Sequence, residues 1–213
     1  MTLPDIYEQF VSGIIETSWL EYIAVFFGIG SVYYSRKEDI LVYPVGLVST
    51  LIYIYISFKW SLLGEAGVNL YYTIMSIYGW ILWSRNTNAD SHLQITTSDA
   101  RDWLLQFAFF SFFYITIYIA LAYLKTNFAP GAIPWADGFA SASAFTGMWL
   151  MARKKVESWY WWIATNIASI PLYFVKHLVF TSVLYFILLL MAFSGLKEWK
   201  KRSAQPKTIY DPA

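Results

Sequence analysis

Seven apolar segments, separated by short polar stretches, organise this chain. A helix needs about 20 mostly apolar residues to cross the hydrocarbon core of a bilayer, and most of the segments approach that length. The pattern predicts an all-α polytopic membrane protein with seven transmembrane helices. The fifth segment is short and rich in Ala, Ser and Gly, so we expect neighbouring helices to shield it. The segments span residues 19–34, 40–58, 66–83, 103–124, 139–152, 159–175 and 178–196.

The distribution of Lys and Arg indicates how these segments are oriented. If every segment crosses the membrane, 12 of the basic residues lie on one side and 3 on the other. Cytoplasmic loops are enriched in Lys and Arg. The bias therefore predicts an external N-terminus and a cytoplasmic C-terminus, which requires an odd number of spans.

A weak internal repeat relates the first three segments to the last three. The third and seventh segments both end in Gly-x-x-x-Trp, closing at Trp83 and Trp199. Aligning Ser49 with Ser169 also superimposes the tyrosines four residues later. We expect three helices, a connector and three more helices, a 3+1+3 parallel-repeat bundle with a ligand site where the triplets meet near the midplane.

This interpretation divides the chain into six parts. They are an extracytoplasmic N-terminal segment (1–18), a first three-helix repeat (19–83), a cytoplasmic linker (84–102), a connector helix (103–124), a second three-helix repeat (133–199) and a cytoplasmic tail (200–213).

Composition excludes several classes of protein. Of the 213 residues, 58% are hydrophobic and 14% charged, against roughly 25% charged in an average soluble domain. A net charge of +1 gives no basic field for nucleic acid, and zero cysteines exclude disulfides and thiolate metal sites. The sequence has neither a phosphate-binding loop nor an H-E-x-x-H metal motif. We therefore expect no enzyme, metal or cofactor.

The ion coupling of the protein can also be predicted. Every carboxylate lies near the end of a segment or outside it, and none lies at the centre of a span. Carboxylates buried in the membrane mark proton relays and coupling-ion sites. We therefore expect transport without proton or sodium coupling.

The sixth segment carries the clearest candidate binding face. Five residues recur there at helical spacing, so one side of the helix presents them together. An Asn within a span is costly unless its amide finds a partner, which favours contact with a ligand. The alternative is packing, because Trp also anchors helices at the membrane surface and Asn can bond a neighbouring helix. The five are Trp159, Trp162, Asn166, Ser169 and Tyr173.

The third and second segments offer further faces of polar and aromatic residues. Indole rings attract flat and especially cationic rings, whereas a phosphate would require Arg or Lys. These walls therefore predict an uncharged or singly positive heterocyclic metabolite. The candidates are Asn69, Tyr72, Ser76, Gly79 or Trp80, and Trp83 in the third segment, with Gly46, Ser49 or Thr50, and Tyr53 in the second.

Several aromatic-rich motifs follow one another along residues 19–202. Tyr71-Tyr72 precedes S-I-Y-G-W-I-L-W at 76–83, W-Y-W-W-I-x-x-N spans 159–166, and Tyr185 precedes Gly-x-x-x-Trp at 195–199. In these motifs the chain resembles the PnuC family of bacterial nicotinamide riboside transporters. The resemblance implies a fold similar to a full-length SWEET sugar transporter, an inner-membrane location and a homotrimer.

The resemblance also implies a mechanism and a set of binding residues. It implies facilitated diffusion of a dephosphorylated vitamin, which a cytoplasmic kinase then traps. By motif match, Trp162, Asn166 and either Trp159 or Trp161 correspond to the substrate-binding face. Relatives of similar sequence are thought to carry thiamine or riboflavin, and the residues do not separate these vitamins. A substrate-binding membrane subunit that needs an external ATPase is the other alternative.

Overall fold

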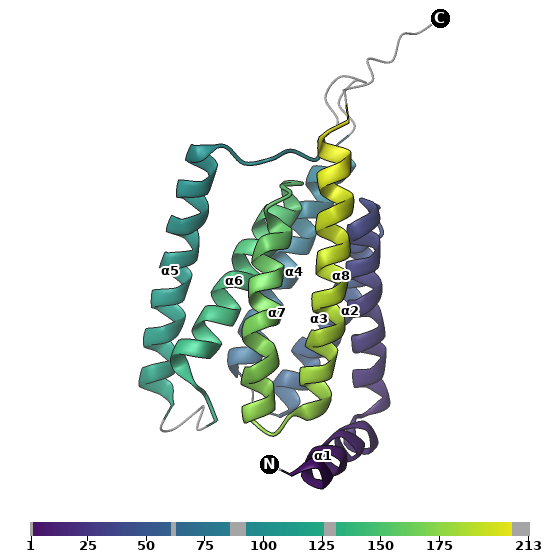
Figure 1. Ribbon diagram of the computed structural model, residues 1–213, viewed down its shortest axis with the longest axis vertical. Coiled ribbons are helices and arrows are strands. Elements are labelled where there is room, and N and C mark those ends of the chain that lie inside the picture. The colour runs from purple at the N-terminus through teal and green to yellow at the C-terminus, as the bar shows by residue number, and fades with distance from the viewer. Residues whose placement is uncertain (1, 61–62, 86–92, 126–130, 206–213) are drawn as a thin grey trace, which may run out of the picture.

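A computed structural model describes residues 2–60, 63–85, 93–125 and 131–205. The prediction of an all-helical membrane protein agrees with it, because each apolar segment lies largely within one helix (Figure 1). The described residues form α1 (Leu3–Glu16), α2 (Trp19–Lys37), α3 (Val42–Lys59), α4 (Leu63–Ser84), α5 (Ala100–Leu124), α6 (Pro134–Ala152), α7 (Ser158–Val175) and α8 (Val179–Ser203).

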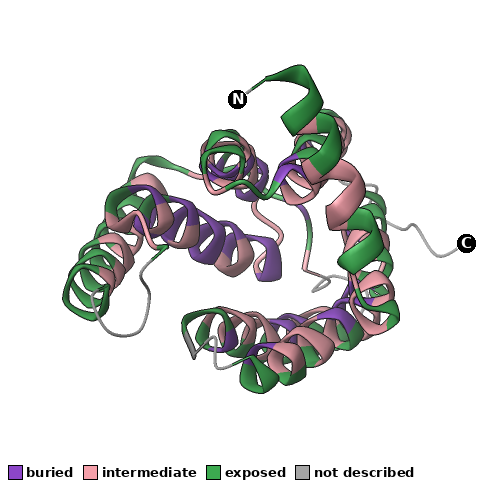
Figure 2. Ribbon diagram, turned by 90° about the horizontal axis from the view of Figure 1, so that it is seen from below, coloured by how far each residue is buried: buried purple, intermediate pink, exposed green. Residues whose placement is uncertain are grey.

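Six of these helices form a closed ring. α2 packs on α3, α3 on α4, α4 on α6, α6 on α7, α7 on α8, and α8 returns to α2. α5 packs mainly on α6, with side chains that also reach α4 and α7, and α1 packs mainly on α8. Seen along the bundle, buried positions lie mainly on helix sides that face other helices, and exposed positions lie on the outside (Figure 2).

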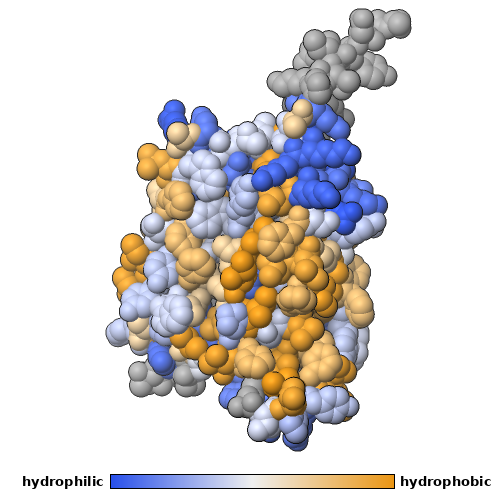
Figure 3. All heavy atoms as spheres, viewed as in Figure 1, coloured by the Kyte–Doolittle hydropathy of each residue, from blue (hydrophilic) through white to orange (hydrophobic). Residues whose placement is uncertain are grey.

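The outer surface of the bundle matches a membrane environment. On the face that Figure 3 shows, apolar side chains cover much of the middle, and hydrophilic ones gather at the end where α8 ends. Taken singly, α3, α5 and α8 are long and apolar enough to cross a membrane, and α1 with α2 qualifies as a bent pair. α6 has many small residues, and α7 combines Trp and Tyr with Asn, Ser and Thr, which lowers their hydropathy. α6 is largely buried by its neighbours, as expected for the fifth segment.

The N-terminal segment contains a helix that the apolar pattern did not predict. Thr2 and Asp5 form a reciprocal capping box at the start of α1, with the Thr2 N–H donating to Asp5 Oδ2 at 2.7 Å. The helix then bends by 102° into α2. Phe10 packs on Phe180 of α8, with ring centroids 6.1 Å apart. The T-L-P-D sequence at 2–5 carried this local signal, which a search for apolar spans overlooks.

Helix boundaries recur at a constant spacing in two pairs of helices. α3 and α7 begin at Val42 and Ser158, and α4 and α8 begin at Leu63 and Val179, each pair 116 residues apart. The alignment of Ser49 with Ser169, 120 residues apart, differs from this spacing by about one helical turn. A shift of one turn keeps the same helix face, so the pattern of side chains alone does not separate the two alignments.

The predicted linker is anchored where the structure describes it. The Thr96 N–H donates to the Lys154 carbonyl at 3.1 Å, and the Val156 N–H donates to the Thr96 carbonyl at 3.0 Å. Ile95 is buried in the same apolar cluster as Val156 and Trp159. The segment therefore packs against the α6–α7 loop; residues 86–92 of the predicted linker lie outside the described residues.

Candidate binding site

The candidate site centres on the side of α7 that faces α4 and α6. Trp162 lies against Tyr72 of α4, with ring centroids 6.2 Å apart and an interplanar angle of 45°. It also packs against Gly147 of α6, where an added Cβ would come within 3.3 Å of the indole. The absence of a side chain at Gly147 thus lets the Trp162 ring sit between two helices.

Asn166 lies one turn further along the same face of α7. The residue is only 3% exposed, yet its amide makes no hydrogen bond with another described residue. Neither the side-chain nitrogen nor the side-chain oxygen of Asn166 is fully enclosed by the described residues, so both keep some accessible surface. A nearly buried amide without a protein partner is costly, and a polar ligand would satisfy it.

A rigid aromatic wall adjoins Tyr72. Tyr71 stacks on Phe145 of α6, with centroids 4.0 Å apart, and its hydroxyl donates to the Phe145 carbonyl at 2.9 Å. Phe145 also meets Tyr72 edge-to-face at 6.1 Å. The sequence analysis did not include Phe145 among the site residues. Only a weak sequence feature points to Phe145 as a site residue: it is the one large side chain in the A-S-A-S-A-F-T-G stretch at 140–147.

Ser169 and Tyr173 continue the α7 face beyond Asn166. Ser169 is 2% exposed, and Tyr173 stacks on Tyr185 of α8 with centroids 5.0 Å apart and nearly parallel rings. Tyr185 therefore joins this group, although the sequence analysis used it only as a motif residue.

Trp159 begins the same face but lies in a packed layer. It is 1% exposed, and its ring covers Gly195 so closely that an added Cβ would overlap it. It meets Trp199 edge-to-face at 5.7 Å, and its indole N–H has no hydrogen-bond partner among the described residues. The surroundings of Trp159 are thus those of a helix-packing residue.

Trp161 lies on a different side of α7 and faces the connector helix α5. Its indole N–H donates to the side-chain oxygen of Gln106 at 2.9 Å, and its ring packs near Phe110 at 5.0 Å. Gln106 is fully buried and in turn donates to the Ser98 hydroxyl at 2.8 Å. The structure does not bring Trp161 together with Trp162 and Asn166.

The remaining candidates divide between the inside and the outside of the ring. Ser76 is 3% exposed and lies one turn after Tyr72 on α4, and Tyr53 of α3 is half-buried. The Asn69 amide donates to the Glu65 carbonyl of its own helix at 2.9 Å. Trp80 is 40% exposed on the outer surface, whereas Gly79 faces inward against Tyr43.

Basic side chains flank the site without entering it. Lys154 pairs with Glu38 at 2.6 Å at one end of the bundle, and Lys176 pairs with Asp137 at 2.6 Å. The described residues contain no group of His, Cys, Asp and Glu side chains that would hold a metal ion. The arrangement offers ring faces and neutral hydrogen-bonding groups, which suits a flat, polar-edged organic molecule.

Known proteins resemble this chain over most of its length. Residues 18–201 match the family described as nicotinamide mononucleotide transporters. The nicotinamide riboside transporter PnuC of Escherichia coli (strain K12) is 26% identical, over 88% of this chain and 87% of that protein. The riboflavin/roseoflavin transporter RibM of Streptomyces davaonensis is 24% identical, over 87% of this chain and 86% of that protein.

A solved structure extends the likeness to three dimensions. The crystal structure of the vitamin B3 transporter PnuC matches with a TM-score of 0.67 and 26% identity, covering 94% of this chain and 89% of that one. Together with the family match over most of the chain, these relatives identify it as a multi-pass membrane protein of a transporter class. The chain belongs to the nicotinamide mononucleotide transporter family.

Proposed function

We propose that this protein carries nicotinamide riboside across the membrane by facilitated diffusion. The observation that carries the proposal is the nearly buried amide of Asn166, which has no hydrogen-bond partner among the described residues and lies one turn from Trp162 on the same face of α7. Nicotinamide riboside has a flat cationic ring for the indole face and a carboxamide edge for the amide. Tyr72 and the stacked Tyr71–Phe145 pair complete an aromatic wall.

Nicotinamide riboside, which lacks a phosphate, suits the neutral residues of the proposed site better than nicotinamide mononucleotide does. A phosphate is normally held by Arg, Lys or several backbone N–H groups. The proposed binding residues are neutral, and two lysines that follow ring helices, Lys154 and Lys176, are engaged by Glu38 and Asp137. The E. coli relative is named for the riboside.

The proposed architecture is two three-helix repeats, α2–α4 and α6–α8, joined by α5. The common separation of 116 residues and the position of α5 outside the ring support it. The charge bias supports an external N-terminus and a cytoplasmic C-terminus in the bacterial inner membrane. Much of the apolar surface of α5 is exposed, and we propose that lipid and the neighbouring subunits of a homotrimer cover it.

The proposed mechanism is uniport. Glu65 lies in the first turn of α4 and Glu21 in the first turn of α2. Neither lies mid-membrane, where a coupling carboxylate is usually found. Substrate movement should therefore follow its own gradient and the membrane potential.

Riboflavin transport is the second candidate function. RibM covers as much of this chain as PnuC does and differs little in identity. Thiamine, another flat-ringed cation, suits the same aromatic wall. An energy-coupled uptake subunit would bind the same ligands and differ in needing an ATPase.

One experiment distinguishes these functions. The melting temperature of the purified protein is measured with nicotinamide riboside, nicotinamide mononucleotide, thiamine or riboflavin, since a ligand stabilises the state that binds it. The best ligand is then tested for uptake by proteoliposomes with the membrane potential clamped. We expect nicotinamide riboside to give the largest shift in melting temperature and gradient-driven uptake without ATP. Stabilisation by riboflavin alone, or binding without uptake, would contradict the proposal.

A further inference from the structure

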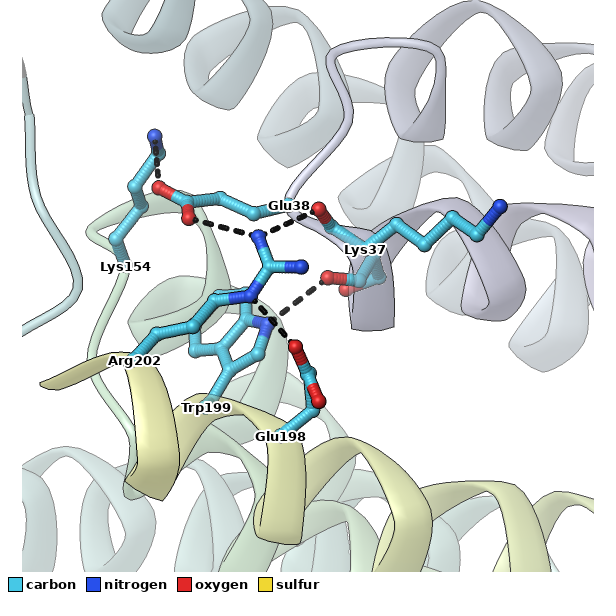
Figure 4. A network of polar contacts seen from close by, with 7 residues as sticks. Lys37, Glu38, Lys154, Glu198, Trp199 and Arg202 are labelled. Atoms are coloured by element: carbon cyan, nitrogen blue, oxygen red, sulfur yellow. Dashed lines mark hydrogen bonds and ion pairs between the residues drawn. The ribbon is translucent and has the colours of Figure 1, made fainter.

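The end of the ring beside the C-terminus holds a set of reciprocal contacts between the two repeats. We name it the crossed seal (Figure 4 labels three of its six residues, Glu38, Lys154 and Trp199). Two members follow the last turns of equivalent helices: Glu38 caps α2 with φ 60°, and Lys154 follows α6 with φ 52°. Their side chains pair at 2.6 Å. The crossed seal comprises Ser35, Glu38, Trp83, Met151, Lys154 and Trp199.

Two tryptophans cross from one repeat to the other in the seal. Trp83 at the end of α4 donates its indole N–H to the Ala152 carbonyl of α6 at 3.1 Å. Trp199 near the end of α8 donates to the Ser35 carbonyl of α2 at 3.0 Å. Each repeat thus uses the last helix of its triplet to hold the first helix of the other. The two rings lie 6.4 Å apart, and Lys154 lies over Trp83 at 4.5 Å.

The seal lies where a substrate would have to leave. Glu38 and Lys154 are 116 residues apart, and so are Ser35 and Met151, whose Oγ and Sδ atoms are 2.9 Å apart. Equivalent residues of two repeats touch each other only beside the axis that relates the repeats. In a parallel-repeat transporter that axis runs along the membrane normal, through the site between the repeats. The crossed seal therefore closes the axial route at this end.

The ionic part of the seal is placed so that it can open. Glu38 also accepts from Arg202 of α8 at 3.3 Å, and Arg202 pairs with Glu198 at 2.9 Å (Figure 4). A cavity of about 670 Å³, lined by Glu38, the linker and the end of α8, adjoins this cluster. Water in this cavity can reach Glu38 once the pair separates, which offsets part of the cost of breaking this mostly buried pair.

We infer that the crossed seal is the cytoplasmic gate, and that the substrate is released when these contacts between repeats break together. The inference rests on the proposed transport function. At the same end of the bundle, Lys155 pairs with Asp102 of α5 at 2.7 Å. That pair resembles Glu38–Lys154 in length and location but does not join the two repeats, which makes it a matched control.

Accessibility of a cysteine placed behind the seal tests the inference without substrate. The protein has no native cysteine, so Ser76→Cys supplies one buried reporter on α4, two turns from Trp83. A membrane-impermeant maleimide is applied to each face of oriented vesicles. Glu38→Gln, Lys154→Gln and Trp83→Phe should each raise labelling from the cytoplasmic face roughly three- to fivefold. Lys155→Gln should leave it unchanged.

The outcomes separate the gate from the proposed substrate. Equal rises from both faces, or the same rise with Lys155→Gln, would mean general loosening and would overturn the inference. Unchanged labelling in all three seal variants, with melting temperatures near that of the parent, would overturn it too. A selective rise from the cytoplasmic face, together with no uptake of nicotinamide riboside by the parent protein that keeps Ser76, would support the gate and reject the substrate.

Discussion

Two neighbouring turns of α7 carry the same kinds of side chain in opposite situations. Trp159 is enclosed by Gly195 and Trp199, and its ring has solid partners on α8. One turn along, Trp162 lies tilted against Tyr72, and Asn166 follows it without a hydrogen-bond partner among the described residues. The first turn contributes to stability by packing, and the second leaves hydrogen-bonding groups unused.

The difference between Trp159 and Trp162 shows how an aromatic face on a membrane helix can be interpreted. Trp is frequent both in helix packing and in ligand recognition, so its spacing does not separate the two roles. The partners of each ring do separate them. A ring enclosed on several sides, as Trp159 is by Gly195 and Trp199, indicates packing, and a ring on the same face as an amide that has no hydrogen-bond partner among the described residues indicates a site. The following predictions test this contrast.

Replacing Trp159 should have the largest effect, and the effect should be on stability. Trp159→Ala removes a fully enclosed ring and leaves a cavity between α7 and α8, which costs about 3–5 kcal/mol. Trp159→Phe should cost much less, because the indole N–H has no partner to lose. Chemical unfolding in detergent measures both. A Trp159→Ala protein that melts normally but does not bind ligand would place Trp159 in the binding site.

Replacing Asn166 should affect binding instead of stability. Asn166→Leu keeps the size of the side chain but leaves the polar edge of the ligand unpaired, a loss of about 1–3 kcal/mol. Affinity for nicotinamide riboside should fall roughly five- to 150-fold. The melting temperature without ligand should stay the same, because no hydrogen bond to a described residue is lost. Calorimetry reports the affinity, and a large drop in melting temperature would indicate that Asn166 has a structural role.

Replacing Trp162 should have an intermediate effect on binding. Trp162→Ala removes the ring face and about 1–2 kcal/mol, which is roughly a five- to thirty-fold loss of affinity. Trp162→Phe should recover part of it, because a weaker ring face remains. Trp161→Phe is the matched control on the other side of the helix: it loses the hydrogen bond to Gln106. If Trp161→Phe reduces affinity as much as Trp162→Ala does, the proposed orientation of the site is wrong.

The sequence predicted the helices well because span length and apolar runs are local properties. It also placed Trp162, Asn166 and Ser169 on one face, since that needs only the helical period. It did not show that Trp159 meets Gly195, or that Trp161 bonds Gln106, because those contacts join different helices and depend on how the helices pack. The choice between Gly79 and Trp80 depended on the rotation of α4 against α3, which spacing alone leaves open.

The smallest effect is expected at Trp80. The sequence allowed Gly79 or Trp80 on the inner face of α4, and in the structure Trp80 is 40% exposed on the outside. Trp80→Ala should leave ligand affinity unchanged and alter stability by no more than about 0.5 kcal/mol, as expected of a surface substitution. At the adjacent position, Gly79→Ala should destabilise the protein, because its new methyl group would overlap the Tyr43 ring. Affinity and melting temperature of both variants are measured together in the same detergent. If Trp80→Ala weakens binding while Gly79→Ala melts normally, α4 is rotated relative to this structure, and Trp80 belongs to the binding face.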